Sequence, residues 1–317
     1  MALYRSTPRT RAFGLLAVAA LTALPWIAQA LGQEFYIGFA ARVLVLALAA
    51  TSLNLVLGFG GMISFGHAAF FGAGAYTVAI LAQQGMASAW LAWPAAIGVG
   101  ALLAAVVGAV SLRTRGVYFI MITLAFAQMA YYLVLSLKVS GGDDGLPLPV
   151  RSGLGFGLDA ADDTTFFYAV LIVFSLALAG LSRLAGSRFG RVIQAIRENE
   201  SRMEAIGYPV FHYKLACFVL GGAVAGLAGA LMANQTGLAS PNQLSWLQSG
   251  MLMVMVILGG VGSLWGGFVG AALLLLVEEI LSGLTVHHQL GVGIALLAVV
   301  LWAPRGVAGL FARNGDG

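Results

Sequence analysis

Long runs without a charged residue constrain the fold of this chain more than any other feature of its sequence. A transmembrane helix needs about 20 mostly apolar residues, because the hydrocarbon core is about 30 Å thick and each helical residue rises about 1.5 Å. At about 20 residues per span, the runs in this chain hold 1, 3, 1, 1, 3 and 1 helices, which predicts an all-α polytopic membrane protein with about ten transmembrane helices. Six runs of 19 or more residues lack Asp, Glu, Lys and Arg: residues 12–33, 43–112, 116–137, 164–182, 215–277 and 280–304.

The amino-acid composition supports this class of protein. Of 317 residues, 60% are hydrophobic and 9% are charged, whereas charged residues make up about 25% of an ordinary soluble domain. A mean hydropathy of +0.94 leaves too little polar surface for a soluble protein and too much apolar surface for a disordered one. The single cysteine, Cys217, excludes an intrachain disulfide and a cysteine metal cluster.

The distribution of basic residues predicts the orientation in the membrane. With a cytoplasmic N-terminus, 13 of the 16 basic residues fall in cytoplasmic segments, so the positive-inside rule favours an even number of spans and two cytoplasmic termini. We expect one transmembrane domain over residues 1–317, with an outer (periplasmic) loop at 138–165 and a cytoplasmic loop at 185–213. Because topology accounts for the basic residues, no basic face is left for binding nucleic acid.

Two of the ten spans have alternative interpretations. Arg5, Arg9 and Arg11 precede the first apolar run, as they would in a signal peptide, but the run is long for such a segment, which favours a retained helix. The eighth span, residues 247–258, is short and is followed by a Gly-Gly-Val-Gly sequence. Such a short span favours a broken or buried helix over a lipid-facing one.

Glycines cluster at two places with a related pattern. The chain has 43 glycines, and Gly-Gly-x-x-Ser occurs both at 60–64 and at 259–263, each time between two apolar runs. Small residues let transmembrane helices pack closely. Glycine also permits unwound segments that line a substrate pathway between discontinuous helices. The sequence is compatible with both interpretations.

The sequence contains no recognisable catalytic constellation. Lys138 and Lys214 are its only lysines, and neither belongs to a Walker A phosphate loop. His-Glu-x-x-His and Gly-x-Ser-x-Gly are absent, so we expect no catalytic residue, no metal site and no enzymatic activity in this chain. His67 is either a polar contact between helices or a pathway residue. Glu278, at the end of a long apolar run, is either a structural or interfacial carboxylate or a gate.

The cytoplasmic loop carries a predicted short helix. Ser201 and Glu204 have the spacing of a capping box, Gly207 suits a left-handed C-terminal cap and Pro209 prevents continuation, which predicts a helix over residues 202–206. An ordinary interfacial loop is the alternative. The apolar residues beside the charges suit the docking of a soluble partner better: Ile196, Met203 and Ile206.

Several motifs together resemble one family of transport proteins. They lie at 53–61, 64–76, 113–119, 123–128, 140–146, 197–200, 204–207, 258–267 and 303–306, so the resemblance covers roughly residues 40–310. The combination is similar to the LivM-like permeases of branched-chain amino-acid ABC importers. Departures are slight, with Ser140 at a usual Thr and Ile206 at a usual Leu.

The resemblance implies a ten-helix permease of the bacterial inner membrane. It implies a second, LivH-like permease as a heterodimer partner, two cytoplasmic ABC ATPases and a periplasmic substrate-binding protein. ATP and Mg would be bound by the ATPases, so no cofactor is expected in this chain.

The resemblance, with the residue types, also gives candidate sites. Movement of the ATPases would act on the cytoplasmic loop, at Arg191, Arg197, Glu198, Asn199, Glu200, Glu204, Ala205 and Gly207. Pathway or gate candidates are Asn54, Ser64, His67, Gln128 and Glu278. Asp143 and Asp144 in the outer loop are candidates for docking the binding protein.

Two other functions compete with an amino-acid importer. Urea, short amides or another small solute would be the cargo of a related importer. A stand-alone secondary transporter or channel would need no ATPase and would not depend on the cytoplasmic loop.

Overall fold

The computed structural model describes residues 8–155, 160–284, 287–302 and 306. Two parts of the sequence analysis fall outside these residues: Arg5, and positions 303–305 of the last motif.

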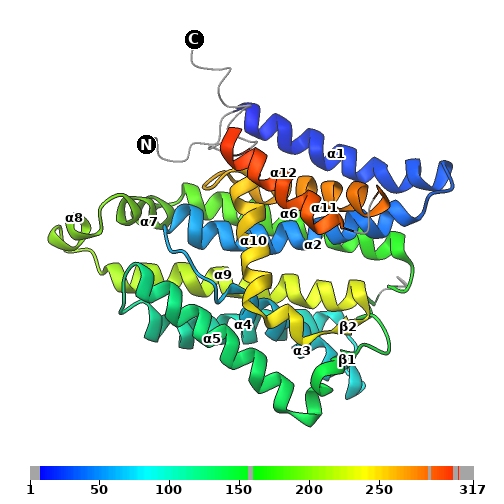
Figure 1. Cartoon of the computed structure of the whole chain (residues 1–317), viewed down its shortest axis with the longest axis horizontal. Helices are drawn as coiled ribbons and strands as arrows, with labels where there is room; N and C mark the ends of the chain where they lie inside the picture. The colour runs from blue at the N-terminus through cyan, green and yellow to red at the C-terminus, as the bar shows by residue number, and fades with distance from the viewer. Residues whose placement is uncertain (1–7, 156–159, 285–286, 303–305, 307–317) are drawn as a thin grey trace.

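Helices make up most of the described chain (Figure 1). The α-helices are α1 (Pro8–Ala30), α2 (Phe35–Asn54), α3 (His67–Gln83), α4 (Ala89–Ser111), α5 (Val117–Ser136), α6 (Asp163–Gly186), α7 (Arg188–Glu198), α8 (Glu200–Ala205), α9 (Val210–Thr236), α10 (Trp246–Gly259), α11 (Gly266–Leu284) and α12 (His288–Trp302). A π-helix, η1 (Leu55–Phe59), continues α2, and short 3-10 turns are η2 (Lys138–Ser140), η3 (Gly142–Asp144) and η4 (Pro241–Leu244). The two-residue strands β1 (Leu146–Pro147) and β2 (Leu238–Ala239) pair antiparallel.

The prediction of an all-α polytopic membrane protein is confirmed. Within the described residues, six helices are long and apolar enough to cross a membrane: Phe35–Phe59, Ala89–Ser111, Val117–Ser136, Asp163–Gly186, Val210–Thr236 and Gly266–Leu284. Leu16–Ala30 and Trp246–Gly259 are apolar but shorter. The number of ten spans and the side on which the termini lie stay predictions.

Helix α2 forms the centre of the bundle. Its residues are buried from Val43 to Asn54, and it packs against α6, α9, α10 and α11. Helices α4 and α5 are less enclosed and expose large apolar side chains, among them Leu102 and Met129. A helix that is apolar all round is thus surrounded by protein, whereas α4 and α5 each leave a face for lipid.

Glycines bring α9 close to α3 and α4. A methyl group added to Gly74 would lie 2.6 Å from the carbonyl carbon of Gly226, and one added to Gly100 would lie 2.5 Å from the Gly222 oxygen. No side chain larger than hydrogen fits these contacts without displacing backbone. At these positions the packing interpretation of the glycines is confirmed.

The short helix α10 differs in direction from its neighbours. Figure 1 shows α10 crossing the long axis of the bundle, whereas α2, α6 and α9 run along it. Buried residues of α10 include Leu252, Met255 and Val256, and the helix packs against α2 and α11. The prediction of a short, buried helix in this region agrees with the structure.

Helices α7 and α8 protrude at one end of the bundle, and β1 and β2 lie at the opposite end (Figure 1). Helix α6 ends at Gly186 and α9 begins at Val210, so α7 and α8 occupy the 185–213 segment between them. The 138–165 segment, with η2, η3 and β1, belongs to the other end. This separation matches two loops that face opposite sides of a membrane.

Two details of the cytoplasmic loop were predicted wrongly. Helix α8 spans Glu200–Ala205 rather than residues 202–206, and Asn199, not Ser201, caps it by accepting a hydrogen bond from the Arg202 N–H at 2.9 Å. Asn199 is as good an N-cap as serine and lies two residues earlier. Ile196 and Met203 do not face outward; both are buried, because the apolar face of the segment packs on the bundle.

Candidate functional site

The first half of the candidate site is a helix break at the end of α2. There the helix widens into the π-helix η1, in which Gly60 N donates to Leu55 O at 3.1 Å and Met62 N donates to Val56 O at 3.1 Å. Gly61 follows with a left-handed φ of +69°. The chain then runs without regular helix to His67, where α3 begins. π-Helical turns are rare within α-helices and frequently mark functional sites.

The second half is the turn between α10 and α11. Helix α10 ends at Gly259, and Gly260 and Gly262 adopt φ angles of +109° and +81°, which favour glycine. Helix α11 begins at Gly266. Both occurrences of Gly-Gly-x-x-Ser therefore lie in breaks between helices.

The structure brings these two breaks into contact. The Asn54 amide donates to Ser263 O at 2.6 Å and accepts from Gly262 N at 2.9 Å. A methyl group added to Gly58 would overlap Asn54 Oδ1 and lie 2.6 Å from Gly262 N. We call residues 58–64 and 259–263 the paired glycine turns. Gly306 belongs to the same place, since a methyl group on it would lie 2.5 Å from Gly260 N.

Arg197 of α7 reaches the paired glycine turns from the cytoplasmic loop. Its guanidinium donates a hydrogen bond to the carbonyl of Gly58. Its stem covers Gly61, where an added methyl group would lie 2.7 Å from Arg197 Cγ. Among the eight loop residues expected to serve coupling, Arg197 thus contacts the first glycine turn, although the residue as a whole is exposed.

Two further pathway candidates, Ser64 and His67, are buried beside the first turn. His67 Nε2 lies 2.8 Å from Ser52 Oγ, which itself donates to Ala49 O. His67 Nδ1 is buried without a hydrogen-bond partner among the described residues. Ser64 Oγ accepts from Gly66 N at 3.2 Å. One interpretation of His67 was a polar contact between helices. Its hydrogen bond with Ser52 joins α3 to α2 and is such a contact.

Gln128 and Glu278 lie elsewhere. Gln128 lines an apolar groove of about 760 Å³ between α4 and α5. Glu278 lines a cavity of about 280 Å³ with Gln289, formed by α10, α11 and α12. The structure therefore gathers Asn54, Ser64 and His67 at the junction of α2 and α3, and leaves these two candidates outside that junction.

Ion pairs hold α8 against the end of the bundle. Arg115, in the turn between α4 and α5, lies 2.9 Å from Glu204 and 3.4 Å from Glu200. Lys214 of α9 lies 2.6 Å from Glu200. Arg115 and Lys214 were not among the predicted site residues, and only their opposite charge to the loop glutamates could have indicated them. Glu204 therefore has an internal partner rather than a free carboxylate.

A cavity of about 190 Å³ lies behind α8. Its walls include Gly61 from the first glycine turn, Phe119 from α5 and the three paired charges Arg115, Glu200 and Lys214. The cavity joins the ion pairs of α8 to the first glycine turn. Movement of α8 would change its shape.

The tip of the 185–213 segment, residues 206–208, is exposed. Ile206 is 63% exposed, and the neighbouring Tyr208 is 39% exposed. Gly207 has a φ of +94° and no atom within 4 Å of an added methyl group. The remaining predicted coupling residues on this surface are exposed too: Arg191, Glu198, Asn199 and Ala205. The exposed Ile206 and Tyr208 leave this end of the segment accessible to a partner.

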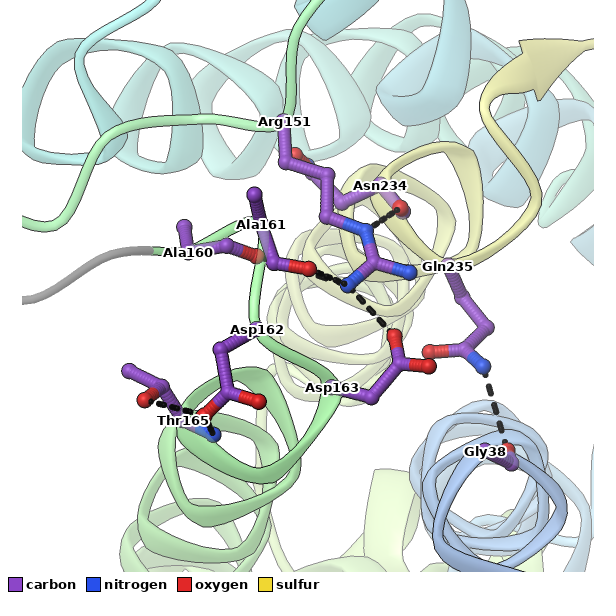
Figure 2. A network of polar contacts seen from close by, with 9 residues as sticks. All are labelled: Gly38, Arg151, Ala160, Ala161, Asp162, Asp163, Thr165, Asn234 and Gln235. Atoms are coloured by element: carbon purple, nitrogen blue, oxygen red, sulfur yellow. Dashed lines mark hydrogen bonds and ion pairs between the residues drawn. The ribbon is translucent and has the colours of Figure 1, made fainter. Parts of the chain in front are cut away.

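A polar network organises the opposite end. Figure 2 shows Arg151 among three chain segments: it donates to Asn234 O at 3.1 Å and pairs with Asp163 at 2.7 Å. Asn234 Oδ1 accepts from Ser152 N at 2.6 Å. The guanidinium also lies 5.0 Å from the centre of the Phe166 ring. Sequence reasoning placed Arg151 in the outer loop without assigning it this role.

The acidic residues of the outer loop differ in their surroundings. Asp143 and Asp144 form most of η3 and are both exposed, which leaves them accessible to a partner. Asp162 caps α6 and accepts from the Thr165 hydroxyl at 2.9 Å and its backbone N–H at 3.0 Å. These hydrogen bonds lower the pKa of Asp162 below its ordinary value. Among the described residues, no three His, Cys, Asp or Glu side chains gather where they could hold a metal ion.

The amino-acid sequence is similar to those of several transport permeases. The permease protein LivM of the high-affinity branched-chain amino acid transport system of Escherichia coli is 29% identical over 294 residues, covering 86% of this chain and 69% of the relative. The LivH permease of the corresponding Salmonella typhimurium system is 27% identical, covering 83% of this chain and 91% of the relative. A probable LivM permease of Methanocaldococcus jannaschii is 26% identical over 67% of each chain. No solved structure gives a significant match.

The family comparison covers most of the chain. A model described as the permease component of branched-chain amino acid transport systems matches residues 35–302. The matched region includes α2, both glycine turns and the α7–α8 segment. The chain therefore belongs to the family of branched-chain amino acid ABC transporter permeases and is a LivM-like member of it.

Proposed function

We propose that this chain is the membrane subunit of an ATP-driven importer for branched-chain or related amino acids in the bacterial inner membrane. It forms the translocation pathway with a second, LivH-like permease. Two cytoplasmic ATPases bind ATP and Mg and drive it through the 185–213 segment, and a periplasmic binding protein delivers the cargo. The chain itself is one transmembrane domain without catalytic activity or cofactor.

The observation that carries this proposal is the construction of α7 and α8. The exposed tip around Ile206 offers a surface to a soluble protein, while Arg197 on the same segment contacts the paired glycine turns inside the bundle. A loop that served only to connect two spans would need neither. A segment that joins an external docking surface to a helix break has the properties required of a mechanical coupling element.

The names of the relatives support the cargo and the second permease. LivM and LivH proteins of the same high-affinity branched-chain amino acid system both resemble this chain. An importer with two related permeases follows by analogy. At the opposite end, Asp143 and Asp144 are exposed and suit docking of a binding protein with basic residues on its surface.

Bulky substitution at the tip of α8 tests the coupling role. Gly207→Leu forces a side chain into a φ of +94° and reshapes the docking surface without touching another residue. We expect the same amount of protein in the membrane and loss of ATP-dependent uptake. Glu204→Leu, which also breaks the pair with Arg115, should act in the same direction.

Gly85→Leu is the matched control, because Gly85 also has a positive φ, +80°, and no atom within 4 Å of an added methyl group, but lies between α3 and α4. It should transport normally. Normal uptake by Gly207→Leu would contradict the coupling role. Uptake in liposomes by this chain without any ATPase would favour a secondary transporter or channel. Competition of leucine uptake by urea or short amides would reassign the cargo.

A further inference from the structure

We propose that Arg197 is a positioning residue that transmits displacement of α7 and α8 to both glycine turns at once. The inference rests on the proposed coupling function and goes beyond it, because it assigns an internal relay to a residue otherwise expected to face the ATPases. Four structural observations carry it.

The first observation is the state of the Gly58 carbonyl. In the π-helix, the N–H groups of Gly60, Gly61 and Met62 donate to the carbonyls of Leu55, Leu57 and Val56 respectively. The Gly58 oxygen lies at the C-terminal end of this helix and receives the guanidinium of Arg197 instead. A cation there satisfies an orphan carbonyl and also interacts favourably with the helix dipole.

The second observation is the fit of the Arg197 stem. An added methyl group on Gly61 would lie 2.7 Å from Cγ, and one on Gly262 would lie 3.5 Å from Nη1. The same side chain therefore lies against both glycine turns. The fit is tight at Gly61, where even a methyl group would collide with the stem, and looser at Gly262, which the guanidinium only approaches.

The third observation is that the turns are joined to each other. Asn54 uses its donor for Ser263 O and its acceptor for Gly262 N, and it is 1% exposed. A displacement of Gly58 would meet Asn54 and Gly262 directly, since an added methyl there overlaps the amide oxygen. Force on the first turn thus reaches the second.

The fourth observation is the position of Arg197 in the chain. It lies in the last turn of α7, two residues before Asn199, the cap of α8. Helices α3 and α11 begin at His67 and Gly266, just beyond the respective turns. A shift of the docked α8 is therefore passed through two residues to Arg197, and from there to the starts of two helices.

The test uses the complete transporter reconstituted in liposomes, with ATP hydrolysis and amino-acid uptake measured on the same preparation. Arg197→Gln should keep the ATPases bound and hydrolysing ATP while uptake per ATP falls at least about tenfold, the size expected for losing a charge-assisted hydrogen bond. Arg197→Lys should restore part of the uptake per ATP, because lysine keeps the charge but lacks the planar guanidinium. Arg188→Gln, at a second exposed arginine on the same helix, should leave the ratio unchanged.

A second variant approaches the contact from the other side. Gly61→Ala keeps the arginine at position 197 but pushes its stem away from the turn, so it should lower uptake per ATP as well. Gly32→Ala is its control, since Gly32 has a similar φ of +66° and no atom near an added methyl group.

The outcomes separate the two proposals. If Arg197→Gln and Gly61→Ala lower hydrolysis and uptake in parallel, so that their ratio is unchanged, Arg197 is only structural and the inference is overturned. If the unmodified chain assembles with no ATPase, the proposed function itself has failed. Uncoupling by both variants, with intact controls, supports the relay.

Discussion

At the residue scale, one buried amide joins the two halves of the candidate site. Asn54 is 1% exposed, and both ends of its amide bond to the turn between α10 and α11. Few other side chains offer a donor and an acceptor in one rigid plane at this reach. The paired glycine turns therefore depend on asparagine at this position.

Asn54→Ala should destabilise the protein by about 2–4 kcal/mol, because two hydrogen bonds are lost and two backbone groups stay buried without partners. Asn242→Ala, at an exposed position in η4, should change stability by less than about 0.5 kcal/mol. Thermal unfolding in detergent, followed by the fluorescence of the tryptophans, measures both. Equal stability of the two variants would show that the amide does not hold the turns together.

Asp162 gives a pH-dependent prediction at the same scale. Hydrogen bonds from the Thr165 hydroxyl and N–H lower its pKa in the folded protein. A lowered pKa contributes stability that is present above the ordinary carboxyl value and is lost as the pH falls through the lowered one. The start of α6 should therefore loosen on acidification below about pH 4, within the range where an ordinary aspartate titrates.

Hydrogen exchange of the Thr165 amide, corrected for the intrinsic rate at each pH, follows this loosening. Asp162→Asn keeps the oxygen that accepts the hydrogen bond and removes the titration. Its exchange protection should be independent of pH over the same range. A variant that loses protection on acidification as the unmodified protein does would locate the titrating group elsewhere.

The residue scale also shows what sequence reasoning could not give. Arg197 and Asn54 were identified as candidates from the sequence, but their contacts join residues far apart in the chain: Arg197 and Gly58 are separated by 139 positions, and Asn54 and Gly262 by 208. No local pattern determines such a pairing. Arg151 was missed as an organising residue for the same reason, because Asn234 lies 83 positions away.

At the element scale, close helix packing depends on particular glycines. Helices α4 and α9 meet where Gly100 faces Gly222 and Gly226. Gly98, on the same helix, has no atom within 4 Å of an added methyl group. The two positions differ in packing alone and make a matched pair.

Gly100→Ala should cost about 1–3 kcal/mol, because the new methyl group would lie 2.5 Å from a backbone oxygen that cannot move alone. Gly98→Ala should be neutral or stabilising by up to about 1 kcal/mol, since alanine is the better helix former. Thermal unfolding of the two purified variants measures both changes in stability. If both behave alike, the helices are not held by this contact.

The elements of the cytoplasmic loop were partly predictable. Gly207 has the positive φ expected of a C-terminal cap. The start of α8 was wrong because Asn199 and Ser201 are both good N-caps, and only the tertiary contact of Glu204 with Arg115 removed the capping-box partner of Ser201. Competition between equivalent local signals is decided by packing.

At the scale of the whole molecule, the lengths of the apolar runs and the positions of the charges predicted the class of the protein but not its internal arrangement. Apolar runs separated by charges predict spanning helices because lipid cannot satisfy backbone polar groups. The direction of α10 across the bundle and the meeting of the two glycine turns follow from packing between distant helices (Figure 1). The Gly-Gly-x-x-Ser motif at 259–263 indicated a turn between two helices. It did not indicate that this turn meets the one at 58–64.

The central claim is that the exposed tip of α8 docks an ATPase. Cys217 is the only cysteine and is buried, so Ile206→Cys places a single accessible thiol at the tip. A photoreactive maleimide on this thiol, activated in native membranes that import amino acids, should capture an ATPase subunit. The same reagent on Val139→Cys, an exposed position in η2 at the opposite end, should not. Efficient labelling of Ile206→Cys in a transporter that remains active, without capture of any ATPase, would contradict the account.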